Sequence, residues 1–391
     1  MKHLLLTAAL LLAAPALAHD TGHGEAARYR LFVADAEAGR VTVADLGQGE
    51  VAAFDLPSPA RLYLGPDGRH VWALSRDAGA VRVIDSGRAT EDHGDHAAVV
   101  LHAPALTEAA LSGEVPVHFN TGGDRVAIFW DGTGTATLHD VEGRTTLARL
   151  ETGKPHHGVA VPVGEATILT VAPEGEGLPD ALALVDAAGA ERLRIGCLNL
   201  HGEGKAGPFI AFGCEDGVAI FDTAASPPAA RVVPYPADAP QGGMIRQILS
   251  PGATLALVGS FGPDHLVVLD PTAEDGDFRF TALPAPRMAF ALTETGEVGF
   301  AILADGRLVR FSALTGAILA ETSGITGPYS MDRGVIRPMM AVAGDRVAIS
   351  DPAQGSVVVV DAEDLTVIER IEVGGVPQSL VLLAADADHD H

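Results

Sequence analysis

The stretch HFNTGGDRVAIFWDGTGTATLHD, residues 118–140, decides the fold class of this chain. It contains an apolar run, a Gly-Asp turn, a second apolar run, an Asp-Gly turn and a third run that ends in Asp. Such Gly and Asp pairs supply the positive φ angles that tight hairpin loops require. The stretch is therefore predicted to form short antiparallel strands joined by tight turns.

The same pattern returns along the chain at a period of about 45 residues. Further copies lie at residues 61–85, 246–270, 288–311 and 339–361. Four short strands per unit at this period are typical of propeller blades, and long amphipathic helical patterns are absent. We therefore predict an all-β fold, a β-propeller.

The number of blades follows from the residue that opens each innermost strand. These residues are Arg61, His118, His157, His201, Arg246, Arg287, Arg337 and Gln378. The last unit, PQSLVLL, supplies one strand, and RYRLFVADA, GRVTVADL and EVAAFDL near the N-terminus supply three more. Closing the ring with strands from both ends removes an exposed sheet edge. We predict eight blades; seven is the alternative if the stretch around Ser323 to Gly334 is a loop excursion.

The two ends of the chain differ in composition from the repeats. Residues 1–18 have the positive start, apolar run and small-residue cleavage site of a secretory signal peptide. We predict a flexible His- and acid-rich tail at 19–28, one propeller domain at 29–384 and an acidic, His-containing tail at 385–391. No later stretch approaches the roughly 20 apolar residues of a membrane span. The expected location is the periplasm, without membrane insertion.

Net charge limits the classes of partner. With 26 Lys and Arg against 51 Asp and Glu, the formal charge is −25. Such a chain repels nucleic acid and anionic lipid, so we expect no nucleic-acid partner. A solvated acidic surface explains this charge more simply than a specific role for cations.

Three consecutive blades place a histidine at the channel mouth. His118, His157 and His201 each open an innermost strand and lie about one blade apart, so they should converge in space. Three imidazoles could bind Zn²⁺, with a carboxylate or water as fourth ligand, although imidazole also suits Cu²⁺ and Ni²⁺. The alternative is that each histidine only hydrogen-bonds a neighbouring carbonyl.

Other residues of the channel have predicted roles beside the three histidines. Glu203, two residues beyond His201, is the predicted fourth ligand. His156 should point away from the channel, and Asp124 and His102 are further candidates. We expect the arginines at the same depth to pair with channel carboxylates, with an anion-binding role as the alternative; they are Arg61, Arg246, Arg287 and Arg337.

A second group of histidines lies in acidic segments. The N-terminal tail contains His19, Asp20 and His23, and the loop EDHGDH contains His93 and His96. Histidine with carboxylate is a compositional indication of metal binding. We predict auxiliary, loosely binding zinc sites in these segments.

The chain has two cysteines, Cys197 and Cys214, on either side of a predicted hairpin. In an oxidising compartment this arrangement favours a disulfide. A zinc site that uses both sulfurs is the alternative, but the spacing lacks a zinc-finger pattern.

The PHHG and LHGEG segments, the EDHGDH loop, the start of the chain and the repeats together resemble the AztD-type periplasmic zinc chaperones. The resemblance spans essentially the whole chain, although its propeller part is generic. It implies a non-catalytic metallochaperone that passes Zn²⁺ to the solute-binding protein of an ABC zinc importer. It also implies zinc ligands among His118, His157 and His201 and an auxiliary site at His19 and His23.

Two other classes of function stay open. A propeller with histidine and arginines in its channel could hold a d1-type haem, although a CxxCH motif is absent. A protein-interaction scaffold with incidental histidines is the second. The chain has no nucleophile elbow, P-loop or dinucleotide fingerprint, so we expect no enzyme activity.

Overall fold

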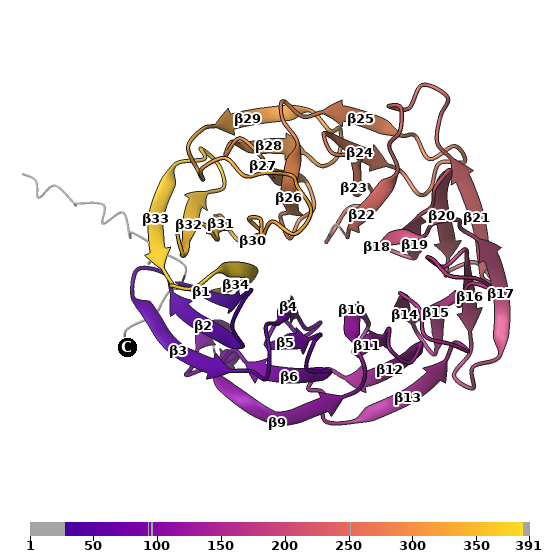
Figure 1. The fold of residues 1–391 in the computed structure, drawn as a ribbon, viewed down its shortest axis with the longest axis horizontal. Helices are drawn as coiled ribbons and strands as arrows, with labels where there is room; N and C mark the ends of the chain where they lie inside the picture. The colour runs from indigo at the N-terminus through magenta and orange to yellow at the C-terminus, as the bar shows by residue number, and fades with distance from the viewer. Residues whose placement is uncertain (1–27, 93, 95–96, 251, 386–391) are drawn as a thin grey trace, which may run out of the picture.

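A computed structural model describes residues 28–92, 94, 97–250 and 252–385. Within these ranges all regular structure is β-strand, and no helix is long and apolar enough to cross a membrane. Eight four-stranded antiparallel sheets are arranged as blades in a ring (Figure 1), and residues in or next to their inner strands line a central channel. The predicted eight-bladed propeller is confirmed. The predicted signal peptide and both predicted tails lie almost wholly outside the described residues.

Each blade runs from an inner strand at the channel to an outer strand at the rim. The inner strands are β4 (Arg61–Leu64), β10 (Pro116–Gly122), β14 (Ala160–Val163), β18 (His201–Ala206), β22 (Ile245–Leu249), β26 (Arg287–Leu292), β30 (Met340–Ala343) and β34 (Pro377–Ala385). The second strands are β5 (His70–Ser75), β11 (Arg125–Trp130), β15 (Ala166–Val171), β19 (Phe209–Gly213), β23 (Leu257–Phe261), β27 (Val298–Leu303), β31 (Arg346–Asp351) and β1 (Arg28–Asp35).

The outer half of each blade is similarly regular. The third strands are β6 (Ala80–Asp85), β12 (Thr135–Asp140), β16 (Ala181–Val185), β20 (Gly217–Asp222), β24 (His265–Leu269), β28 (Leu308–Ser312), β32 (Ser356–Asp361) and β2 (Arg40–Asp45). The outermost strands are β9 (Ala105–Ser112), β13 (Thr146–Glu151), β17 (Glu191–Gly196), β21 (Ala229–Pro234), β25 (Arg279–Ala282), β29 (Ile318–Thr322), β33 (Val367–Glu372) and β3 (Gly49–Asp55).

The ring is closed as predicted, by strands from both ends of the chain. β34 pairs antiparallel with β1 from Arg28 opposite Ala385 to Asp35 opposite Pro377. This sheet has the order β3-β2-β1-β34, so its inner strand is the last in sequence. The stretch from Ser323 to Gly334 contains no strand and connects β29 to β30. It is a loop, but it removes no blade.

Burial explains why the middle strands read as apolar runs. β31 and β32 are buried along nearly their whole length, whereas the outer β33 has mostly exposed side chains. Apolar clusters fill the spaces between neighbouring blades; one contains Trp72 of β5 together with Phe119 and Trp130 of the next blade. Because neighbouring blades share these clusters, the inner strands are held in fixed positions around the channel.

One element was not predicted from the sequence. β7 (Arg88–Asp92) and β8 (Ala97–Leu101) form a separate two-stranded ribbon between β6 and β9. The loop that contains the predicted auxiliary ligands His93 and His96 joins these two strands, and both histidines lie outside the described residues.

Candidate metal centre

A cavity of about 670 Å³ lies at the mouth of the central channel. Most of the residues predicted to open the innermost strands line it: Arg61, His118, His157, His201, Arg246, Arg337 and Gln378. Arg287 is the exception. Its Nη1 donates to the His265 carbonyl oxygen at 3.3 Å, and burial lowers the pKa of Arg287 to about 10. Of the eight residues predicted to open the innermost strands, seven therefore line the cavity.

Two of the three predicted imidazoles face each other across this cavity. The Nε2 atoms of His118 and His157 are 3.3 Å apart. Two nitrogens bound to one tetrahedral Zn²⁺, each at about 2.0–2.1 Å, are separated by roughly 3.3 Å. The pair therefore has the spacing of two ligands of a single ion.

Asp131 fixes the orientation of His157. It follows β11, and its Oδ2 is 2.7 Å from His157 Nδ1, while its Oδ1 accepts from the Gly158 amide at 3.3 Å. Asp131 is 13% exposed and His157 45% exposed, so the imidazole reaches out from a sheltered carboxylate. A carboxylate on one ring nitrogen orients the other nitrogen toward a metal and makes it more basic.

Glu203 makes a longer contact with the Nδ1 atom of His118. Its Oε1 is 3.4 Å from His118 Nδ1 and accepts from Asn120 Nδ2 at 3.0 Å. Burial alone would raise the pKa of Glu203, but the contacts with His118 and Asn120 lower it by a larger amount, so the net shift is downward. Glu203 therefore contacts the Nδ1 atom of His118, while the Nε2 atom of the same ring faces His157.

His201 is oriented by the backbone. Its Nδ1 donates to the Asn199 carbonyl oxygen at 2.9 Å, and its Nε2 is 3.3 Å from Arg246 Nη1. Burial lowers the pKa of His201, and Arg246 and the other two histidines lower it further, which favours the neutral imidazole that metals bind. Within the described residues, no three histidine, cysteine or carboxylate side chains are arranged to hold an ion as they stand. His201 would have to turn from Arg246 toward the other two rings.

A disulfide flanks the hairpin that carries His201. Cys197 and Cys214 are bonded, with their Cα atoms 5.0 Å apart, as predicted. They flank the hairpin of β18 and β19, in which His201 pairs with Gly213. The bond therefore ties the start of β18, the strand that carries both His201 and Glu203, to the end of its partner strand β19.

Comparison with known proteins gives the family. The chain is 30% identical over 382 residues to the zinc chaperone AztD of Citrobacter koseri, which covers 93% of this chain and 89% of that protein. The crystal structure of Citrobacter koseri AztD superposes with a TM-score of 0.87 at 29% identity, over 93% of this chain and all of that one. The chain belongs to the AztD family. No family model matches the sequence.

The alternative that the channel holds a d1-type haem is tested by a second structural similarity. The chain superposes on the dihydro-heme d1 dehydrogenase NirN with a TM-score of 0.59 at 12% identity, over 90% of this chain and 74% of NirN. At this identity the likeness shows a shared propeller fold alone.

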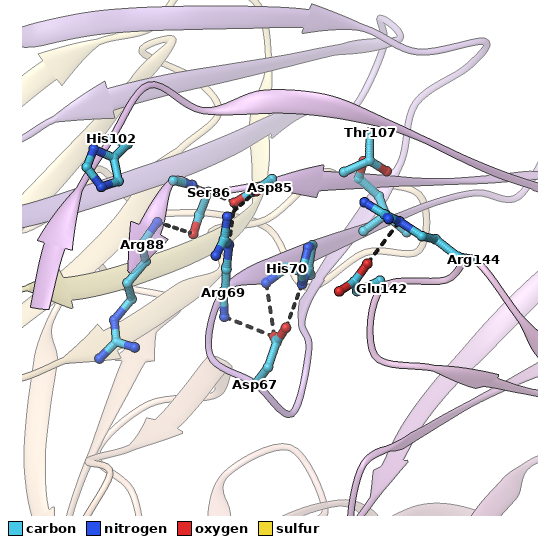
Figure 2. Close-up of polar contacts among 12 residues, drawn as sticks. Asp67, Arg69, His70, Asp85, Ser86, Arg88, His102, Thr107, Glu142 and Arg144 are labelled. Carbon is cyan, nitrogen blue, oxygen red and sulfur yellow. Dashed lines mark hydrogen bonds and ion pairs between the residues drawn. The ribbon is translucent and has the colours of Figure 1, made fainter. Parts of the chain in front are cut away.

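The other histidines and acids considered as ligands lie elsewhere. His156 is buried; its Nδ1 is 2.9 Å from the Lys154 carbonyl oxygen and its Nε2 is 3.1 Å from Thr170 Oγ1. Asp124 lies in the turn at the far end of β10. His102 pairs with Glu91 on the ribbon, its Nε2 2.9 Å from Glu91 Oε1. Figure 2 shows His102 together with the Arg69–Asp85 and Asp67–His70 pairs, and none of these residues is part of the cavity lining.

Sequence reasoning missed Asp131 and gave the arginines the wrong partners. Asp131 is the first residue of an Asp-Gly pair, so its pattern indicated only a turn. Among the ion pairs of the described residues, none joins Arg61, Arg246, Arg287 or Arg337 to a carboxylate. The carboxylates at the mouth contact histidines instead, because Glu203 and Asp131 project from the histidine-bearing side of the ring.

Proposed function

We propose that this chain is a zinc chaperone that holds one Zn²⁺ at the channel mouth with His118, His157 and His201. The observation that carries the proposal is the 3.3 Å separation of the His118 and His157 Nε2 atoms. Family membership supports the choice of zinc, since the Citrobacter koseri relative is named a zinc chaperone. The protein acts by binding rather than by catalysis.

Glu203 and Asp131 serve this site as orienting carboxylates in our proposal. Each contacts the Nδ1 atom of a histidine whose Nε2 faces the other ring. Glu203 was the predicted fourth ligand, but in this geometry it holds His118 in place. The fourth position is then open to water or to a group of the acceptor, which suits an ion that must leave again.

The site works in the periplasm and supplies an importer. Residues 1–18 read as an export signal, and the Cys197–Cys214 bond suits an oxidising compartment. The acceptor is the periplasmic solute-binding protein of an ABC zinc importer. His19, Asp20, His23, His93 and His96 lie outside the described residues; we propose that they bind zinc loosely and pass it on.

Zinc binding is tested first on the purified protein without its first 18 residues. Metal-free protein is titrated with Zn²⁺ against a chromophoric chelator, beside the His201→Ala and His265→Ala variants. We expect one tight site, lost in His201→Ala and retained in His265→Ala, whose histidine pairs with Asp264 away from the mouth. Tight zinc that survives His201→Ala would contradict the assignment.

Transfer requires a separate experiment. Zinc movement to an apo solute-binding protein is compared with movement to a chelator of equal affinity, with and without residues 20–25. We expect faster movement to the protein, and slower transfer after the deletion with unchanged affinity at the mouth. Equal rates in all cases would mean that the protein only buffers zinc.

A further inference from the structure

Three arginines share the channel mouth with the histidines. Arg61, Arg246 and Arg337 line the same cavity. In ring order, Arg61 lies one blade before His118 and Arg246 one blade after His201 (Figure 1). Arg337 precedes β30, four blades from His157 in a ring of eight, and so lies across the channel. The histidines are therefore flanked and faced by guanidinium groups.

These guanidinium groups lack carboxylate partners among the described residues. Arginines away from the mouth commonly have one, as Arg125 does with Glu165 and Arg192 with Asp186. Arg337 instead donates from Nη2 to the carbonyl oxygens of Met331 and Asp332, each at 2.7 Å. Its buried Nε has no hydrogen-bond partner. The mouth thus has positive groups left over in a chain of net charge −25.

Zinc makes this excess positive charge larger. Arg246 Nη1 is 3.3 Å from His201 Nε2, the atom that would bind the ion. A divalent cation held there lies close to a guanidinium group, and the two repel each other. An anion bound between the arginines and the ion would be attracted by both.

We propose that the mouth binds a small polycarboxylate between Arg61, Arg246 and Arg337, beside the zinc site. Guanidinium groups bind carboxylates through paired, charge-assisted hydrogen bonds. The cavity, about 670 Å³, has the size of ordinary small-molecule sites, and Gln247 and Gln378 add neutral amide groups to its lining. Carboxylate binding by the metal-free protein does not depend on the proposed zinc function.

The coupling between the two ligands does rest on the proposed function. If the carboxylate reduces repulsion between zinc and the arginines, each ligand raises the affinity of the other by the same factor. The protein would then take up zinc most tightly together with an organic acid, and would release it more easily when the acid leaves.

The test uses propane-1,2,3-tricarboxylate and isothermal titration calorimetry at constant ionic strength. We expect saturable binding to the metal-free wild type and tighter binding to the zinc-loaded form. Arg61→Gln and Arg246→Gln should each weaken binding by about tenfold or more. Arg337→Gln should do the same, with a thermal melt to check the loop that it holds. Arg192→Gln, on the outer strand β17, is the matched control and should bind like the wild type.

His157→Ala separates this inference from the proposed function, because it should lose zinc but keep carboxylate binding. Absence of saturable binding to the wild type, or binding unchanged in the Arg61→Gln/Arg246→Gln variant, would overturn the proposal. Equal affinity of the metal-free and zinc-loaded forms would overturn the coupling. An acidic peptide that binds through the arginines when the free tricarboxylate does not would overturn the assignment to a small ligand.

Discussion

The channel mouth has two halves that occupy equivalent positions of the propeller. In the histidine half (His118, His157 and His201) every Nδ1 atom has an oxygen partner: Glu203, Asp131 and the Asn199 carbonyl. In the arginine half (Arg61, Arg246 and Arg337) no described carboxylate neutralises the charge. The same strand openings thus give one half that is oriented in advance for a cation and another that is left for an outside ligand. The fold sets where a side chain stands, and the neighbouring loops set what it can bind.

Removing two imidazoles from the histidine half should cause the largest loss of zinc affinity. We expect His157→Ala with His201→Ala to weaken zinc binding on the order of ten-thousandfold, because each ligand contributes roughly 3 kcal/mol. The thermal midpoint of the metal-free protein should change little, since the closed ring does not depend on a metal. Competition with a chelator measures the affinity. Stoichiometric, chelator-resistant zinc in the double variant would show that the histidine half is not the site.

Breaking the disulfide tests whether the histidine half needs its covalent support. Cys197→Ser with Cys214→Ser should lower the free energy of unfolding by about 2–4 kcal/mol. Denaturation of the oxidised wild type and of the variant gives the difference. The bond itself is checked by thiol titration of the unfolded, non-reduced protein. Two free thiols there would contradict the structure.

Substitution of an orienting carboxylate should cause a smaller loss of zinc affinity. Asp131→Asn keeps the shape of the side chain but removes the negative charge that contacts His157 Nδ1. We expect zinc affinity to fall by about 10- to 100-fold. Asp264→Asn is the matched control, because Asp264 Oδ1 is 2.8 Å from His265 Nδ1 in a pair outside the mouth. If both substitutions leave the affinity unchanged, Asp131 has only a structural role.

The pH dependence should distinguish His118 from His201. Burial alone would lower the pKa of His118, but the nearby Glu203 carboxylate raises it by a larger amount, so the net shift is upward. The net shift of the His201 pKa is downward. Zinc needs the neutral ring, so affinity should begin to fall, by about tenfold per pH unit, at a higher pH than an ordinary histidine would give. Glu203→Gln removes the cause of the upward shift and should move this fall to lower pH. Titrations of both proteins at a series of pH values measure it; identical profiles would contradict the role of Glu203.

The smallest expected effect is an increase in zinc affinity rather than a loss. Arg246→Gln removes a positive charge beside His201 Nε2, so without added carboxylate it should raise zinc affinity by roughly threefold, the size of a screened surface interaction. Arg192→Gln should leave the affinity unchanged. A decrease in Arg246→Gln would mean that the guanidinium group helps to hold the zinc site together.

The halves also show how far sequence reasoning reaches. Alignment of the repeats predicted that His118, His157 and Arg337 line one cavity, because the first residues of the inner strands occupy equivalent positions in every blade. It could not show that Glu203 approaches Nδ1 rather than Nε2, since that depends on side-chain torsions and on Asn120 of another blade. Asp131 was missed because an Asp before Gly reads as turn chemistry whatever its carboxylate touches.

The ribbon of β7 and β8 escaped prediction for a different reason. It lies outside the four-strand pattern of its blade, in which β6 pairs directly with β9. A search for repeats compares each unit with its neighbours, so it finds what the blades share. An insertion that belongs to one blade is invisible to such a search.

The closing strand sets an order of events for every new copy of the protein. Ribosomes build a chain from its N-terminus, so among the strands of the described residues β1 is made first and β34, its partner in the same sheet, is made last. A chain that stops before Pro377 leaves β1 with an unpaired edge and lacks Gln378 at the mouth. The three histidines are synthesised long before the ring around them can close. A complete channel mouth therefore records that synthesis has passed the last strand.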